Sequence, residues 1–400
     1  MKIMVCNIGS TSFKFQFINM EDEVVIAHGD IDRVGSPNSD SEANFYSGED
    51  ELRFHFSGSV SNQREAVRLW QHSLTSLGVR PSDIDAVGFK TVQAGEENGS
   101  VLLTDQVLEA MERYSALAPA HNPPYLSAIR MFRESMPGKP LVGVFEPGFH
   151  IHRPDYAQVY GVPYEWFELG VRKYGYHGAS LRYVTGETIR ILNLNPRNHK
   201  IVAFHLGGSS SVCAFLNGVA IDTSMGFTPQ SGLIQSARNG DIDPFVIPYI
   251  MKKKGITMEQ VFTELASNGG LKGISGTSGD MRDIREEIEK NGPLAARCRL
   301  ARTKYIYDIS CYMGSYIVLM GGLDAVCFTG GIGQKDSVLR AVVLSYLDFL
   351  GFSLDKGANK RNEEKIHSIV SKIAALVLET NEEIVVARET ARVVDGLKEK

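Results

Sequence analysis

Two Gly/Ser-rich turns follow apolar segments at matching places in the two halves of this chain. NIGSTS begins at Asn7 after the run IMV, and HLGGSS begins at His205 after KIVAF. Aligned without a gap, their apolar, Gly and Ser positions coincide, and an alternating strand-like segment follows each turn. One Gly–Ser turn is common in proteins. Two at equivalent places predict a duplicated α/β domain.

A third Gly-rich turn, FTGGIG at 328–333, follows the expected strand DAVCF and precedes a helix expected to begin near Ser337. A strand–turn–helix junction can bind an anion, because backbone N–H groups and the helix dipole point at it. Each turn alone is more often ordinary turn chemistry, but three in a duplicated α/β chain favour phosphate binding. The chain lacks GxxxxGK[ST], and its first turn lacks GxGxxG, so neither a P-loop nor a dinucleotide fold is favoured.

Bulk properties exclude several classes of partner. A chain of 400 residues predicts two domains, and a formal net charge of −5 provides no basic field for nucleic acid or an anionic membrane. The N-terminus lacks a secretory pattern, and the apolar segment 309–323 is short for a membrane span and predicts a buried core helix. We therefore expect a cytoplasmic protein. Free buried thiols are expected at its five cysteines, which lack CxxC spacing: Cys6, Cys213, Cys298, Cys311 and Cys327.

Periodicity predicts the regular elements that carry these turns. Alternation places Phe13, Phe15 and Phe17 on one face of a strand. Helices are expected at 64–78, at 103–116 and in HNPPYLSAIRMF, where the prolines suit a first helical turn. LVGVF at 141–145 predicts a strand, and the Asn-Gly pair at 217–218 predicts a hairpin turn.

Several loop-like segments carry side chains suited to phosphoryl transfer. That reaction needs cations and N–H donors around the moving group, with a carboxylate to hold a metal ion. His121, His177 and His205 each lie near Gly or Pro, which suits a binding cleft better than a packed helix, although a core histidine remains the ordinary alternative. Arg238, in ARNGDIDP, suits an anion clamp, with a surface ion pair as its alternative.

Motifs along nearly the whole chain, from residue 3 to about 392, resemble the acetate kinase (acetate/propionate kinase) family. They are NIGSTSFKF, LAPAHNPP, VPYEWFELGVRKYGYHGAS, HLGG, IDTSMGFTPQSGLIQSARNGDIDP, GISGTSGDMRDI, CFTGGIG and TNEEIVVARET. The resemblance implies an α/β fold of two duplicated actin-like, Hsp70-like (ribonuclease H-like) domains flanking a nucleotide cleft. The domains would span 1–149 with 382–400, and 150–381. It also implies transfer of a phosphoryl group between ATP and a short-chain carboxylate, which gives ADP and an acyl phosphate. The reaction would depend on Mg²⁺ or Mn²⁺, and the protein would be a homodimer.

The same resemblance implies roles for individual residues. Asn7 and Glu382 would hold the metal ion, and Ser10, Ser12 and Lys14 would lie in the first phosphate region. His177 and Arg238, with His121 and His205, would stabilise the phosphoryl group in flight. The nucleotide site would be lined by His205, Leu206, Gly207, Gly208, Ser209, Asp280, Met281, Arg282, Gly331, Ile332, Gly333, Gln334 and Lys335. From the residues alone, Lys14 could instead be the polar face of a strand, and Glu382 a helix-end charge.

The sequence departs from the family pattern at the acceptor site. In FKTVQAG, Lys90 stands where the family has the Arg that binds the acceptor carboxylate, and Gln93 replaces a His. Lysine lacks the planar fork of arginine, so bidentate carboxylate recognition is lost. In FEPGFH, Glu146 stands at the catalytic Asp position and is one methylene longer.

The expected acyl pocket changes as well. Ala120 and Tyr176 replace a Leu and a Phe, while Val92 and Pro229 match the family pocket. Losing a Leu side chain enlarges a pocket, and tyrosine adds a hydroxyl that needs a partner. These changes predict an acceptor larger or more polar than acetate.

Three kinds of function remain open from the sequence: an active kinase with another acceptor, a paralogue with weak or no transfer that binds nucleotide or acyl phosphate, and an actin-type assembly protein. Asn7, His177, His205, Arg238 and Glu382 are all present, which favours the active kinase. The HNPP and YGYHG segments have no use in an assembly protein. At the nucleotide side, Gln334 and Lys335 replace an acidic residue and an amide.

Overall fold

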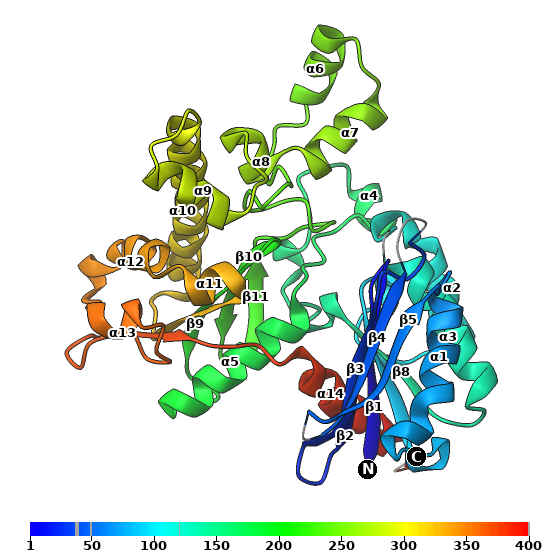
Figure 1. Ribbon diagram of the computed structural model, residues 1–400. Helices are drawn as coiled ribbons and strands as arrows, with labels where there is room; N and C mark the ends of the chain where they lie inside the picture. Colours follow the sequence, from blue (N-terminus) through cyan, green and yellow to red (C-terminus); the bar gives the residue numbers. More distant parts are fainter. Residues whose placement is uncertain (37–39, 49, 120, 399–400) are drawn as a thin grey trace. The chain divides into compact units, whose positions relative to one another are not determined.

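The computed structural model describes residues 1–36, 40–48, 50–119 and 121–398 (Figure 1). The chain divides into two compact units. The first unit comprises Met1–Ile151 with Asn381–Lys400, and the second comprises His152–Thr380. Each unit is described by itself below.

The described residues of the first unit form an eight-stranded sheet with the order β5-β4-β3-β2-β1-β6-β8-β7. Strands β1 to β5 are joined by antiparallel pairing, β1, β6 and β8 run parallel, and β7 returns antiparallel to β8. The strands are β1 (Lys2–Ile8), β2 (Ser12–Asn19), β3 (Val24–Asp32), β4 (Ser41–Ser47), β5 (Leu52–Gly58), β6 (Ala86–Thr91), β7 (Ser100–Leu102) and β8 (Leu141–Phe145).

Helices pack against this sheet. The α-helices of the first unit are α1 (Gln63–Ser73), α2 (Asp105–Arg113), α3 (Asn122–Ser135) and α14 (Glu382–Lys398). The short 3-10 helices are η1 (Leu74–Leu77), η2 (Pro81–Asp83), η3 (Gly95–Glu97), η4 (Ser115–Leu117) and η5 (Glu146–Phe149). The chain enters α3 through prolines at its first positions, as the sequence predicts.

The described residues of the second unit form a five-stranded sheet with the order β11-β10-β9-β12-β13. Its strands are β9 (Lys200–Leu206), β10 (Ser210–Leu216), β11 (Val219–Thr223), β12 (Ala325–Thr329) and β13 (Ala374–Val377). Its helices are α4 (Tyr164–Glu168), α5 (Gly178–Leu192), α6 (Val246–Lys254), α7 (Met258–Ser267), α8 (Gly270–Ser275), α9 (Met281–Glu289), α10 (Ala295–Met320), α11 (Gly330–Lys335), α12 (Ser337–Ser345) and α13 (Lys356–Lys360), with the 3-10 helices η6 (Asp155–Ala157) and η7 (Asp348–Leu350).

The two sheets share a common topology, which confirms the duplication predicted from the Gly/Ser turns. In the first, an antiparallel meander β3-β2-β1 is extended by the parallel strands β6 and β8. In the second, β11-β10-β9 is extended in the same way by β12 and β13. The equivalent turns each contain three residues, 9–11 and 207–209.

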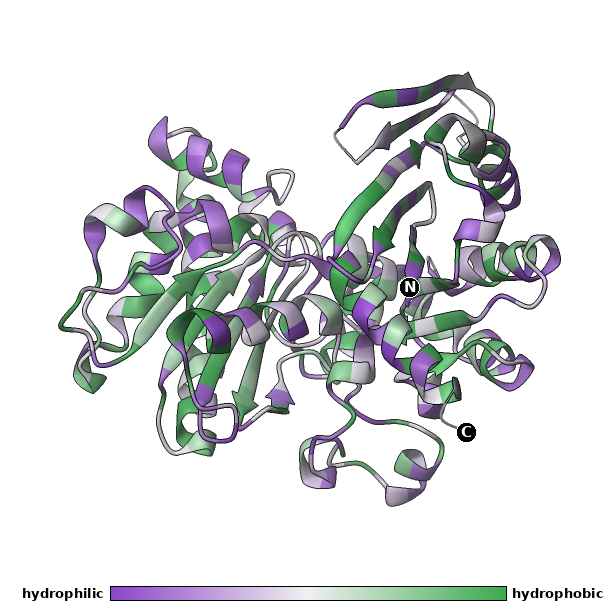
Figure 2. Ribbon diagram, turned by 90° about the horizontal axis from the view of Figure 1, so that it is seen from below, coloured by the Kyte–Doolittle hydropathy of each residue, from purple (hydrophilic) through white to green (hydrophobic). Residues whose placement is uncertain are grey.

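Each unit has its own hydrophobic core, and Figure 2 shows the strands of the five-stranded sheet mainly in the hydrophobic colour. Phe13, Phe15 and Phe17 are buried together on one face of β2, where Trp70 of α1 packs against the first two rings. This confirms the predicted alternation. Asn217 and Gly218 both have positive φ (51° and 89°), which fits the predicted tight turn between β10 and β11.

The structure corrects three expectations. Residues 309–320 of the segment 309–323 form the end of α10, whose last turns expose Val318 (80%) and Leu319 (59%), so that part is not a fully buried core helix. Cys311 is exposed, while the other four cysteines are buried free thiols. The third Gly-rich segment is not an open turn: Gly330–Lys335 forms the helix α11, and only α12 begins at the expected Ser337.

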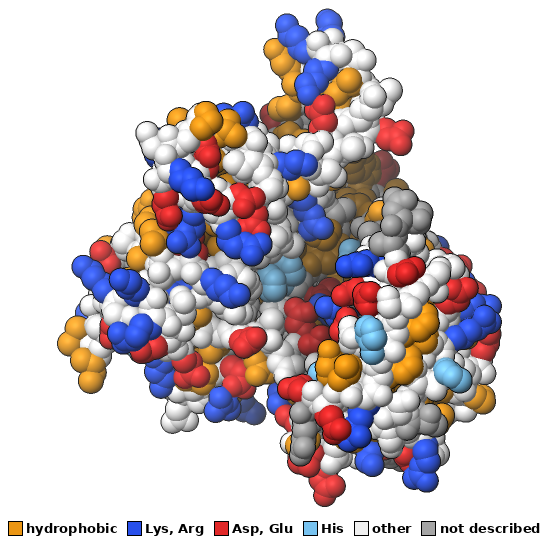
Figure 3. Space-filling view, in the orientation of Figure 1, with side chains coloured by type: hydrophobic (Ala, Val, Ile, Leu, Met, Phe, Trp, Pro, Cys, Tyr) orange, Lys and Arg blue, Asp and Glu red, His pale blue; other side chains and the backbone are white. Residues whose placement is uncertain are grey.

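Two further observations concern the described residues as a whole. None of their helices is long and apolar enough to cross a membrane. Acidic and basic side chains are interspersed over the face shown in Figure 3, as expected for a chain with a formal net charge of −5.

Candidate active site

The NIGSTS segment is the hairpin turn between β1 and β2. The N–H of Gly9 donates to the carbonyl of Ser12 at 2.9 Å, and Gln63 Nε2 donates to the carbonyl of Gly9 at 2.8 Å, so α1 holds the turn. Asn7 lies directly opposite Lys14 across the hairpin. Ser10 is exposed and Ser12 is half-buried at the turn. The turn is thus fixed by backbone and amide hydrogen bonds.

A small cavity lies beside this hairpin. Its volume is about 170 Å³, and its lining includes Asn7, Lys14, His28, Asp30 and Glu383. Burial is the main cause that raises the pKa of Asp30, and the neighbouring Asp32 adds to it. Lys14 is exposed on β2 and is also part of this lining. The structure is therefore compatible both with a role in the first phosphate region and with a position on the polar face of a strand.

Lys90 forms an ion-paired triad with two carboxylates. Its Nζ lies 3.4 Å from Glu146 Oε1 and also pairs with Glu382 Oε2. All three side chains are largely buried, with exposed fractions of 20%, 10% and 16% in that order. Burial by itself would lower the pKa of Lys90, but the charges of Glu146 and Glu382 outweigh it and hold that pKa above its ordinary value. Lys90 is therefore a fixed cation.

Three elements bring the triad together. Lys90 is near the end of β6, which runs parallel to β8, and Glu146 is the first residue after β8. Glu382 begins α14, which packs on β6 and β8. Gly88 of β6 allows the close approach of this helix, because a Cβ there would lie 2.3 Å from Thr390 Oγ1. Glu382 is thus a helix-end charge as well as a partner of Lys90.

Gln93 has a structural role in this chain. Its Oε1 accepts hydrogen bonds from the N–H of Gly95 at 2.8 Å and from Asn98 Nδ2 at 2.6 Å. Its carbonyl accepts one from Asn122 Nδ2 at 2.8 Å. The side chain is fully buried, so it closes the turn after β6 and links it to the start of α3.

In the second unit, His177 and His205 stack with their ring centroids 4.0 Å apart. His177 Nδ1 lies 2.8 Å from Ser211 Oγ, and His205 Nδ1 lies 2.8 Å from Ser180 Oγ. His177 caps α5 in a left-handed backbone conformation (φ 59°), which for a residue other than glycine is strained by about 1 kcal/mol or more. Backbone strain and two serines therefore fix the orientation of this histidine pair.

Arg238 lies close to the turn that follows β9. Its Nη1 donates to Ser209 Oγ at 3.1 Å and to Gln235 Oε1 at 3.3 Å. Ser209 Oγ itself donates to Gln235 Oε1 at 2.8 Å. Burial lowers the pKa of Arg238, and no carboxylate of the described residues offsets that shift. The alternative of a surface ion pair is therefore wrong, and a half-buried guanidinium without a counter-ion suits an anion.

A cavity of about 380 Å³ in the second unit gathers most of the predicted nucleotide residues. Its lining comes from the β9–β10 turn, the start of α9 and the helix α11. The predicted members are Gly207, Gly208, Asp280, Met281, Arg282, Gly331, Ile332 and Lys335. Gln334 lines a different cavity, together with Lys335. Leu206 and Gly333 are buried, and Ser209 bonds Gln235.

The predicted acceptor residues are distributed over both units. Tyr176 is buried in the second unit, and its hydroxyl donates to the carbonyl of Phe227 at 2.7 Å, which is the partner that a buried tyrosine needs. Pro229, in the same unit, accepts a hydrogen bond from Gln235 Nε2. In the first unit, Val92 is half-buried and His121 caps α3. Ala120 lies outside the described residues.

Four contributors to these arrangements were not predicted from the sequence. Arg285 and Asp336 line the larger cavity, Ser211 orients His177, and Gln235 joins Ser209 to Arg238. Arg285 follows Arg282 by three residues on α9, and that spacing places both on one helix face and could have revealed it. Asp336 precedes α12 and caps it, which is a local signal, but its place at the cavity is not. Ser211 and Gln235 contact His177 and Ser209, which are distant in the sequence.

Comparison with known proteins decides the family. The family model of the acetokinase family matches residues 2–388. The chain belongs to the acetokinase family. It is 41% identical to the acetate kinase of Thermosipho melanesiensis, in an alignment that covers 100% of this chain and 99% of the relative.

Solved structures agree with this membership of the acetokinase family. The crystal structure of Porphyromonas gingivalis acetate kinase matches with a TM-score of 0.89 and 32% identity, covering 98% of this chain and 99% of that one. A propionate kinase from Francisella tularensis subsp. tularensis SCHU S4 matches with a TM-score of 0.87 and 32% identity, with the same coverage of 98% and 99%. These matches confirm the predicted fold class, a duplicated actin-like α/β fold.

Proposed function

We propose that this chain is a Mg²⁺-dependent kinase that reversibly transfers the γ-phosphate of ATP to a short-chain carboxylate and so forms an acyl phosphate. The whole-chain similarity to acetate kinases at 41% identity carries the proposal. The cavity lined by Gly207, Gly208, Gly331 and Lys335 supports it, because its size and Gly-rich backbone suit a nucleotide. We propose that the chain has one domain of residues 1–149 with 382–400 and a second domain of residues 150–381, which carries most of the nucleotide site.

Arg238, His177 and His205 would act on the moving phosphoryl group. A phosphoryl transition state spreads negative charge over its oxygens, and fixed donors aimed at that charge stabilise it. Arg238 supplies a half-buried cation held by Ser209 and Gln235, and the histidine pair supplies ring N–H donors held by serines. Because these groups are already oriented, little reorganisation is needed during the reaction.

The residues proposed for the metal ion fit a magnesium site. Mg²⁺ prefers oxygen ligands and is usually bound by one or two carboxylates together with substrate phosphates. Glu382 already binds a cation, the ammonium group of Lys90, and Asn7 supplies an amide oxygen beside Lys14. Among the described residues, no group of three or more acidic, His or Cys side chains could hold a metal ion. In the proposed site, substrate phosphates would therefore have to supply further oxygen ligands. When bound, the ion would neutralise phosphate charge.

Lys90 is the residue that we propose binds the acceptor carboxylate, and Glu146 beside it is the proposed catalytic carboxylate. Lys90 is held as a cation between two carboxylates, so an incoming acceptor carboxylate would have to share this ammonium group with Glu146 and Glu382. A single ammonium group gives weaker geometric selection than an arginine fork. We also propose an acceptor larger or more polar than acetate, because Ala120 and Tyr176 stand where the family's acyl pocket has a Leu and a Phe.

A hydroxamate trap tests the proposed function. The full chain is incubated with MgATP, hydroxylamine and a panel of carboxylates from acetate to branched, hydroxylated and longer acids. Acyl hydroxamate from at least one acid is expected, with none in the Arg238→Met variant. The absence of product with every acid would overturn the proposal, and a highest kcat/KM for acetate would overturn the part that concerns a larger acceptor.

A further inference from the structure

Arg340 is a fully buried charged side chain of the second unit, and it is not part of the lining of the cavity assigned to the nucleotide. It belongs to α12 and is fully buried, with an exposed fraction of 0%. Burial lowers its pKa to about 10, so the guanidinium remains charged at neutral pH. A buried charge is costly unless its donors are satisfied, so its partners reveal its role.

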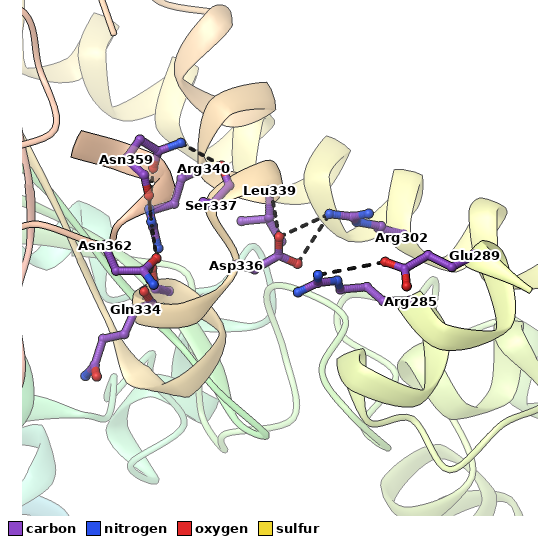
Figure 4. Close-up of polar contacts among 11 residues, drawn as sticks. Arg285, Glu289, Arg302, Gln334, Asp336, Ser337, Leu339, Arg340, Asn359 and Asn362 are labelled. Carbon is purple, nitrogen blue, oxygen red and sulfur yellow. Dashed lines mark hydrogen bonds and ion pairs between the residues drawn. The ribbon is translucent and has the colours of Figure 1, made fainter. Parts of the chain in front are cut away.

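All five N–H groups of Arg340 have acceptors (Figure 4). Nη1 donates to the carbonyls of Gly333 and Gln334, both at 2.7 Å. Nε and Nη2 donate to the side chain and the carbonyl of Asn359 at 2.9 and 2.8 Å, and Nη2 also donates to Asn362 Oδ1 at 2.7 Å. The guanidinium therefore joins the end of α11 to the α13 segment.

The two carbonyls belong to the last turn of α11. A helix leaves its final carbonyl groups without partners of its own, and a cationic side chain can satisfy them. α11 has six residues, far fewer than the roughly 12–15 that an isolated helix needs. Its sequence GGIGQK contains three glycines, each costing about 1 kcal/mol relative to alanine in a helix. Tertiary contacts must therefore hold α11 in place.

The other end of α11 is fixed by the backbone. Gly330 has φ +77°, and a Cβ at this position would lie 2.5 Å from the carbonyl oxygen of Leu206. Beyond α11, Asp336 caps α12 through the N–H of Leu339 at 2.9 Å and pairs with Arg302 of α10 at 3.1 Å (Figure 4). Between these points, Gly331, Ile332 and Lys335 line the cavity. Arg340 thus satisfies the carbonyls of the segment that forms one wall of that cavity.

We propose that Arg340 is a positioning residue for nucleotide binding, which holds α11 in the conformation that lines the nucleotide cavity. This inference rests on the proposed function, since that function assigns the cavity to a nucleotide. Without the guanidinium, the carbonyls of Gly333 and Gln334 lose their partners and α11 samples other conformations. The apparent dissociation constant then rises in proportion to the loss of the binding-competent population. The proposed function assigns the acceptor carboxylate to Lys90 and not to α11, so the KM for the carboxylate should stay unchanged.

Binding of MgADP to the full chain, measured by calorimetry, tests the proposal. Arg340→Met removes all five donors, and we expect the dissociation constant to rise about tenfold, as it does when a competent conformation falls to about one tenth of the population. Arg340→Lys retains the charge and three donors and should give an intermediate value. Asn362→Gly removes one acceptor but tolerates the local φ of 55°, and serves if Arg340→Met does not fold.

Two controls separate positioning from general destabilisation. Val343→Ala shortens a fully buried side chain on the same helix and leaves Arg340 in place, and Arg361→Met removes an exposed arginine that pairs with Glu363. Both should leave the dissociation constant within about twofold of wild type. In folded Arg340→Lys, amide hydrogen exchange across residues 331–336 should be faster than in wild type. The KM for ATP should rise, whereas the KM for the carboxylate should stay unchanged.

The outcomes distinguish the two proposals. A wild-type chain that binds no MgADP overturns the proposed function, and the role of Arg340 with it. A wild-type chain that binds, with Arg340 and Asn362 variants that bind equally well, overturns the role of Arg340 alone. An equal loss of affinity in Val343→Ala also overturns it, because that result would show that stability controls binding.

Discussion

Replacing Lys90 by methionine tests whether the buried triad is held by its central cation. At 3.4 Å and an effective dielectric constant of about 20, the attraction between Lys90 and Glu146 is about 5 kcal/mol before desolvation. Removal of one partner of a buried pair costs about 3–5 kcal/mol, because the other charge stays buried without its counter-ion. Here two carboxylates lose their counter-ion. We expect Lys90→Met to lower the free energy of unfolding by about 3 kcal/mol, the low end of this range, because Lys90 retains an exposed fraction of 20%.

The expected loss can be measured as a shift of the thermal midpoint. For a domain of about 150–250 residues, each kcal/mol shifts Tm by about 2–4 °C, so Lys90→Met should lower the midpoint of the first unit by about 9 °C. Calorimetry at pH 7 would follow this transition. Lys139→Met serves as the control, because this half-buried lysine of the same unit lies in the loop between α3 and β8, and its effect should stay within about 0.5 kcal/mol.

A second replacement decides whether charge is the cause. In the Lys90→Met background, Glu382→Gln removes one of the two uncompensated carboxylates and should recover part of the lost stability. A shift below about 2 °C for Lys90→Met would refute the reasoning on the buried triad. A double variant less stable than Lys90→Met would show that the loss comes from packing and not from the unpaired charges.

Further predictions concern other contacts. Tyr176→Phe removes the donor to the Phe227 carbonyl and should cost about 1–2 kcal/mol, measured by chemical unfolding; an unchanged stability would contradict this contact. Gln235→Leu removes the acceptor shared by the serine and arginine of the phosphoryl site and should lower kcat about tenfold in the hydroxamate assay, without a matching loss in Tm. Arg388 holds the pKa of Glu23 below its usual value, so the folded chain binds fewer protons there than the unfolded chain, and the pair stabilises above pH about 4.3. The exposed pair should contribute about 0.5–1 kcal/mol at pH 7, and the difference between wild type and Arg388→Met should vanish as the pH falls toward 3; a difference that is the same at pH 7 and pH 3 would contradict it.

Local sequence patterns were sufficient to predict the duplicated hairpins. The Gly/Ser turns after β1 and β9 and the Asn217-Gly218 turn depend on residues adjacent in the chain. Alternation in β2 likewise needs only a few residues to show which face is buried. Equivalent turns at equivalent places then implied the duplication, because each unit repeats the same strand pairing. These features follow from local conformational preference and from period-two burial.

The conformation of 330–335 could not be predicted from its own residues. GGIGQK has the composition of a turn, because glycine disfavours a helix by about 1 kcal/mol. The segment is nevertheless helical, and its last carbonyls are satisfied by Arg340. Only tertiary contacts resolve this conflict, and such contacts leave no local signal. For the same reason, Lys90 gives no indication of its pairing with Glu382, which is 292 residues away.

The residues that replace the family's residues at the proposed acceptor site differ in whether their polar atoms already have partners within the chain. Gln93 uses its side-chain oxygen to close the turn after β6, and Tyr176 donates its hydroxyl to a backbone carbonyl. The side-chain oxygen of Gln93 and the hydroxyl of Tyr176 are therefore already hydrogen-bonded within the chain. Lys90 differs because its partners are ionised side chains, and charges can be shared with an incoming carboxylate. The choice of acceptor thus depends on how Glu146 and Glu382 divide this ammonium group with the substrate. Lys90→Arg combined with Glu146→Asp should shift that balance toward acetate, and an unchanged preference in the hydroxamate assay would contradict this view.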